Sequence, residues 1–79
     1  MANLHVFAQD VLVFQMIEPV ESGNSLIGRY EIVNGGRFNQ KIGFVTEGRP
    51  VTVLVGGRPG IIKKLPQGGT IQIDLCDAK

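Results

Sequence analysis

The sequence lacks most of the residues that would point to a chemical site. It has one cysteine, one histidine and no tryptophan among its 79 residues. A single cysteine excludes an intramolecular disulfide. One cysteine and one histidine cannot supply the roughly four ligands of a structural zinc site, and the acidic residues show no calcium-loop spacing. We therefore expect no metal and no cofactor.

An excess of charge of one sign is missing too, and so are long apolar runs. Eight basic residues balance seven acidic ones, for a net charge of +1. This balance removes the electrostatic argument for nucleic acid or an anionic membrane as the partner. No apolar run reaches the roughly 18–20 residues that cross a bilayer, and no basic segment precedes an apolar one as in a secretory signal. We expect a cytoplasmic protein, or a virion component if a virus encodes it.

The short chain predicts one domain over residues 1–79, with little stability to spare. Hydrophobic residues make up 43% and charged residues 19%, which is typical of a globular chain. The core of such a domain supplies no more than about 3–5 kcal/mol. Because disulfides and metals are excluded, a partner surface is the remaining source of stability, unless packing within the chain suffices.

Glycine and proline are abundant and divide the chain into short segments. Turn signals fall at residues 34–36, 47–50, 56–60 and 66–69. Such regular spacing predicts a meander, a sandwich or a small barrel. Asn34-Gly35 is the strongest signal, since both residue types tolerate a positive φ. We predict hairpin turns centred on Gly35, Gly48, Gly57 and Gly68.

The segments between the turns alternate between apolar and polar residues. This period of two predicts strands over residues 26–33, 38–45, 51–55 and 70–76. A weaker strand at residues 61–65 is flanked by prolines and therefore belongs at a sheet edge. The predicted fold is all-β, a barrel or sandwich of five to six antiparallel strands in a meander. The predicted core consists of Tyr30, Ile32, Ile42, Phe44, Val51, Val53, Val55, Ile71, Ile73 and Leu75.

The first quarter of the chain fits two kinds of element. Apolar residues at helical spacing allow one short helix over residues 4–16, whereas its β-branched residues favour one long or two short strands. We favour strands and keep the helix as the alternative. Residues 18–25 are the longest polar stretch, which indicates an exposed loop or a binding loop.

A search for catalytic groups finds one Cys–His pair and little else. It could only join Cys76 to His5, and the carboxylates of Asp74 and Asp77 would raise the thiol pKa and deactivate it. Neither serine lies in a nucleophile elbow, and residues 56–60 lack the ending of a phosphate-binding loop. We expect no catalytic residues and a non-enzymatic protein.

The stretch of residues 11–17 is apolar on both sides of a predicted strand. One side carries Leu12, Phe14 and Met16, and the other side is mostly apolar as well. Apolar surface left over after folding marks a protein contact. The sequence therefore predicts a structural or protein-interaction module that buries this face against itself or in a larger assembly. Virus-particle cement proteins and inhibitors are examples of this class.

A second hypothesis comes from residues 38–46, followed by the strand at residues 51–53. This stretch loosely resembles the cold-shock domain, in which a Lys-Gly-Phe-Gly-Phe run precedes a Val-Phe-Val strand; Ile42 and Thr52 stand where aromatic residues are expected. The resemblance implies a small barrel that binds single-stranded nucleic acid by stacking bases beside basic side chains. Its contacts would be Phe38, Lys41 and Phe44.

Three arginines follow glycines at the turns. In a meander, Arg37 and Arg58 would lie at one end of the sheet and Arg49 at the other. Arginine holds a carboxylate or phosphate through two parallel hydrogen bonds. These residues are therefore candidate contacts for an acidic protein surface or an anion, and the alternative is that they are solvated turn residues.

Overall fold

The structure, a computed structural model, describes residues 3–16 and 26–78, and its secondary structure is entirely β. The helix considered for residues 4–16 is wrong, because two separate strands occupy that segment. The predicted loop at residues 18–25 and Ile17 lie outside the described residues. The described strands are β1 (Asn3–Phe7), β2 (Val11–Met16), β3 (Leu26–Asn34), β4 (Gln40–Glu47), β5 (Val51–Val55), β6 (Arg58–Pro59), β7 (Ile62–Leu65) and β8 (Thr70–Asp77).

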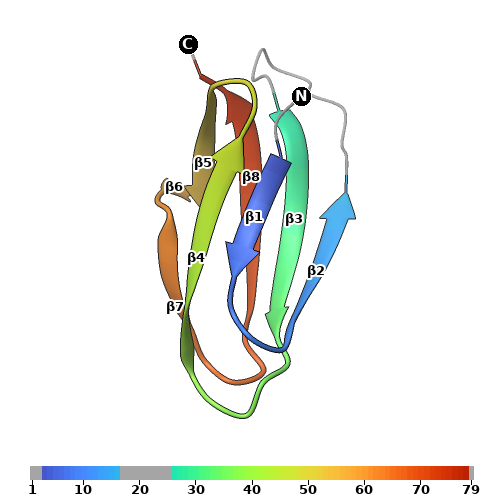
Figure 1. Ribbon diagram of the computed structural model, residues 1–79, viewed down its shortest axis with the longest axis vertical. Coiled ribbons are helices and arrows are strands. Elements are labelled where there is room, and N and C mark those ends of the chain that lie inside the picture. Colours follow the sequence, from blue (N-terminus) through green and yellow to red (C-terminus); the bar gives the residue numbers. More distant parts are fainter. Residues whose placement is uncertain (1–2, 17–25, 79) are drawn as a thin grey trace.

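The strands form two antiparallel sheets (Figure 1). We call the sheet with the order β1-β4-β7 sheet A, and the sheet with the order β2-β3-β8-β5-β6 sheet B. The expected meander of five to six strands is wrong, since most sequence neighbours lie in different sheets and the described residues form eight strands. A strand with one apolar side can bury that side in either layer, so alternation alone does not assign it to a sheet. The described strands do not close into a barrel.

Of the four predicted hairpins, only the one at Gly57 exists. Residues 56 and 57 join β5 to β6, with Val55 opposite Arg58 and φ values of 61° and 85° at the two glycines. The turns at Gly35, Gly48 and Gly68 instead carry the chain from one sheet to the other. Both kinds of connection need the same glycine-rich residues, because both reverse or redirect the chain within a few positions.

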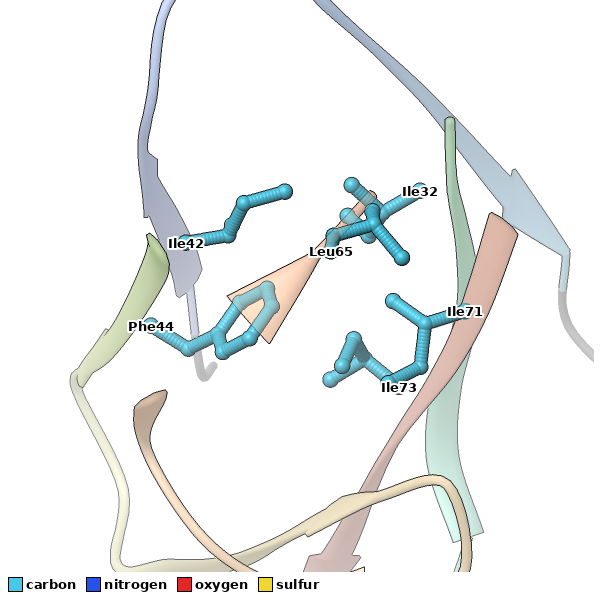
Figure 2. Close-up of a cluster of buried hydrophobic side chains, with 6 residues drawn as sticks. All are labelled: Ile32, Ile42, Phe44, Leu65, Ile71 and Ile73. Carbon is cyan, nitrogen blue, oxygen red and sulfur yellow. The ribbon is translucent and has the colours of Figure 1, made fainter. Parts of the chain in front are cut away.

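The core lies between the two sheets and is contributed by both. Figure 2 shows Ile42 and Phe44 on one side and Ile32, Ile71 and Ile73 on the other, with Leu65 between them. The core prediction is confirmed for six residues, which are buried, while four others are only half-buried. Leu65 was not predicted, because it follows an exposed run at the end of a weak strand. The half-buried residues are Tyr30, Val51, Val53 and Val55.

A fully buried asparagine ties together one end of the molecule. Asn34 ends β3, and its Nδ2 donates to three backbone oxygens at 3.0–3.2 Å. Its Oδ1 accepts hydrogen bonds from the Gly36 amide and from Gln40 Nε2, at 3.0 and 2.9 Å. Asn34 thereby joins the β3–β4 and β7–β8 connections, which the turn interpretation of this residue did not anticipate. The three oxygens belong to Phe38, Leu65 and Pro66.

Candidate functional site

The outward side of β2 carries an exposed apolar stripe, which we call the β2 patch. It consists of Leu12, Phe14 and Met16, whose exposed fractions are 57%, 51% and 44%. Successive strand residues point to opposite faces, so these three side chains share one side. Val11 packs against the core from the other side, and the patch therefore points away from the core.

The position of β2 explains why its apolar residues stay exposed. The strand is at one end of the strand order in sheet B and pairs only with β3 among the described strands. Sheet B has more strands than sheet A, so its edge is not fully covered by the opposite layer. Even Val13, which lies opposite the buried Ile32, is 45% exposed. The structure thus buries neither side of β2 completely.

The β2 patch is bordered by polar residues of β3 and β8. Phe14 lies opposite Glu31, and Met16 lies opposite Arg29. The Arg29 guanidinium donates to both carboxylate oxygens of Asp74, at 2.9 and 3.3 Å, in the half-buried middle of the sheet. This ion pair neutralises the charges of Arg29 and Asp74. The border of the β2 patch therefore keeps one net negative charge, that of Glu31.

The outer side of sheet A carries a second group of apolar residues, which we call the sheet A patch. Phe7, Val45 and Ile62 are 60%, 51% and 64% exposed. Gly43 lies opposite both Phe7 and Ile62, and a side chain added there would contact the Phe7 side chain at 3.8 Å. Sequence reasoning missed this patch because it kept both strands and a helix open for residues 4–16 and therefore assigned Phe7 to no face. The period of two in residues 3–7 was the signal that could have revealed it.

Two lysines accompany the sheet A patch. Lys41 of β4 and Lys64 of β7 are directly opposite each other and both are exposed. Like charges directly opposite across an antiparallel pair repel each other. Neither lysine takes part in a salt bridge within residues 3–16 and 26–78. On the same outer side, His5 Nε2 and a carboxylate oxygen of Glu47 are 2.9 Å apart.

The three predicted arginine contacts do not form the expected arrangement. Residues 35–39 form the lower end of the molecule in Figure 1, whereas β6 lies partway along its side. Arg37 and Arg58, which belong to these two segments, are therefore not brought to one end, because the meander that required it does not exist. Arg49 follows β4 and pairs with the carboxylate of Asp77. Whether the three bind a partner stays a prediction.

The nucleic-acid contacts are divided by the fold. Phe44 is 1% exposed in the core, so a base cannot stack on its ring, and its assignment as a contact is wrong. The Phe44 side chain points toward sheet B, because alternate residues of β4 point into the core. Phe38 is 78% exposed in the β3–β4 connection, and Lys41 is exposed on the outer side of sheet A. Only these two remain available to a ligand.

The Cys76–His5 pair does not form. Cys76 follows the buried Leu75 on β8 and points to the outer side of sheet B, whereas His5 lies on the outer side of sheet A. Burial raises the pKa of the Cys76 thiol, Asp74 and Asp77 raise it further, and Arg29 lowers it in part. A raised pKa keeps the thiol protonated at neutral pH, which makes it a weak nucleophile.

Comparisons with protein-family models, with curated proteins and with solved structures give no match. Within the described ranges there is no group of three or more His, Cys, Asp or Glu residues that could hold a metal ion. The same ranges contain no helix that is long and apolar enough to span a membrane. The two outer patches are therefore the features on which a function can be argued.

Proposed function

We propose that this protein is a non-enzymatic structural module that buries the β2 patch against another protein surface. The observation that carries the proposal is the exposure of Leu12, Phe14 and Met16 side by side on one edge strand. Burial of the exposed halves of three such side chains contributes roughly 2–4 kcal/mol before the costs of association. That free energy is comparable to the stability of a small domain, so burial of the β2 patch would stabilise the protein substantially.

The fold suits such a role in three ways. The packing of a core between two sheets supports a small sandwich, whose outer sides are free to make contacts. The patch lies at a sheet edge, where an added strand or surface meets least obstruction. Its border is polar, as in protein interfaces with an apolar centre. The partner is a copy of the chain or a larger assembly, in the cytoplasm or in a virus particle.

The proposal is tested with Phe14→Glu, which places a charge in the centre of the β2 patch. We expect sedimentation equilibrium at high micromolar protein to show an assembly for the wild type and a folded monomer for the variant. Loss of the aromatic contact weakens association by about tenfold or more, since ~1.4 kcal/mol is a factor of ten.

The matched control is Phe38→Glu, the same replacement at an exposed phenylalanine outside both patches. It should keep the wild-type mass. A wild-type protein that stays monomeric at high micromolar concentration and binds no partner contradicts the proposal. Outright unfolding of Phe14→Glu would show that Phe14 belongs to the core.

A second candidate function is binding of single-stranded nucleic acid. The observation in its favour is the combination of exposed Phe38 with Lys41 and Lys64, although buried Phe44 removes the central contact of the cold-shock comparison. A mobility-shift assay with mixed oligonucleotides at low salt tests it. Binding should weaken steeply with salt and with Lys41→Ala. We expect no binding at tens of micromolar protein, because the net charge is only +1.

A further inference from the structure

We infer that the β2 patch of one copy docks on the sheet A patch of the next copy, so that the chain assembles head to tail. This inference rests on the proposed function and names the partner surface. The occupant of the β2 patch is thus a second copy of this chain, and the contact is heterologous: two different patches meet.

The two patches match in the number and kind of their exposed apolar side chains. Each presents three exposed apolar side chains and includes one phenylalanine, Phe14 in one case and Phe7 in the other. On the sheet A patch, Gly43 lies between Phe7 and Ile62 and has no side chain. The ring of an incoming Phe14 can approach the backbone closely at this point.

Charge complementarity favours the pairing of unlike patches. The sheet A patch lies beside Lys41 and Lys64, which repel each other and form no salt bridge within the part of the chain described. The β2 patch lies beside Glu31, opposite Phe14. In a head-to-tail contact, Glu31 of one copy meets the lysine pair of the next and offsets its repulsion.

The same charges disfavour the pairing of like patches. Two sheet A patches face to face would place four lysine side chains and only two carboxylates, those of Glu47, in one contact. Two β2 patches would bring two Glu31 carboxylates together. Like charges brought together at an interface disfavour association. A two-fold symmetric dimer through either patch is therefore the weaker arrangement.

The geometry makes the assembly extendable. Buried side chains of both sheets point inward (Figure 2), so the two patches look in opposite directions. The molecule measures 39 × 22 × 19 Å. The area of its broadest face is comparable to the roughly 800 Å² that one partner contributes to a standard interface. Unlike patches on opposite sides generate a ring if the rotation closes and a filament if it does not.

Mixing two variants tests the inference. Phe14→Thr blocks the β2 patch and Phe7→Thr blocks the sheet A patch, and threonine keeps the preference for a strand. In a solution of one variant, every contact between copies would include a substituted patch. We therefore expect each variant alone to be a folded monomer at a concentration where the wild type forms species larger than a dimer. A one-to-one mixture restores a single wild-type contact, between the sheet A patch of Phe14→Thr and the β2 patch of Phe7→Thr. We expect the mixture to form a heterodimer and nothing larger.

Other outcomes overturn the inference in distinguishable ways. If Phe14→Thr is monomeric but Phe7→Thr keeps the wild-type mass, the β2 patch binds itself or adds a strand; the inference fails and the proposed function stands. A monomeric wild type overturns the inference. If Phe7→Thr does not fold, as judged by circular dichroism, Ile62→Thr takes its place at the same patch. Glu31→Lys should also weaken wild-type association by about tenfold, and an unchanged mass would contradict the charge argument.

Discussion

At the scale of single residues, Asn34 is a position where five hydrogen bonds depend on one side chain. Its amide donates to three backbone oxygens and its oxygen accepts two hydrogen bonds, with no exposure to solvent. A buried polar group costs about 1–3 kcal/mol when left unpaired, and more when charged. The fold therefore favours an amide over a carboxylate at this position.

Asn34→Asp is expected to lower the free energy of unfolding at pH 7 by about 3 kcal/mol or more. The carboxylate cannot donate to the three carbonyl oxygens that the amide contacts. These oxygens raise the pKa of the new acid in the folded state, so the loss is largest above that pKa and shrinks as the pH falls and the acid becomes protonated. Urea unfolding at pH 7 and at low pH measures both effects.

The control for this replacement is Asn39→Asp. The oxygen of Asn39 accepts a hydrogen bond from the Gln67 amide at an exposed position, and a carboxylate does the same. Its free energy of unfolding should change by less than about 0.5 kcal/mol. An equal loss for both variants would show that added charge, and not the buried amide network, is responsible.

At the scale of elements, the turns are where sequence and structure agree least. The Gly56–Gly57 turn is a hairpin as predicted, but the other three turns change sheets. β1 and β2 are short strands joined by a connection in which Asp10 has a φ of 54°. Tight turns are local, so the sequence reveals them; the sheet that a strand joins depends on residues far along the chain.

The hairpin between β5 and β6 needs glycine at position 57 because of the backbone conformation there, and not because a side chain would lack room. Gly57 has a φ of 85°, and a side chain added there would meet nothing within 4 Å. Gly57→Val should lower the free energy of unfolding by about 1–2 kcal/mol, because a β-branched residue is strained at positive φ. Urea unfolding measures the loss. Gly57→Asn should lose clearly less, since asparagine tolerates this region, and equal losses would contradict the explanation.

At the scale of the whole molecule, a small core supports two outer patches. Six buried apolar residues from both sheets form the central cluster, while Leu12, Phe14, Phe7 and Ile62 remain in solvent. Such a domain has little stability in excess, and in the proposed assembly each contact with another copy would add to that stability by mass action. We therefore expect unfolding of the wild type to depend on protein concentration, and unfolding of the patch variants to be independent of it.

The sequence alone determined the fold class, the period of the strands and much of the core. Ile32, Ile42, Phe44, Ile71, Ile73 and Leu75 were predicted and are buried, because a period of two places every second residue on the same side. The same alternation places Leu12, Phe14 and Met16 on one side of β2, but their exposure depends on the position of β2 at the edge of sheet B.

Only the tertiary structure decided which strands pair and which residues meet. It separated β3 from β4, took Phe44 out of reach of any ligand, and brought Phe7, Ile62 and two lysines to one side of sheet A. It also turned Asn34 from a turn residue into a buried link between connections. Pairing depends on contacts between residues far apart in the chain, and local alternation and turn chemistry are nearly the same in every arrangement that buries the same side chains.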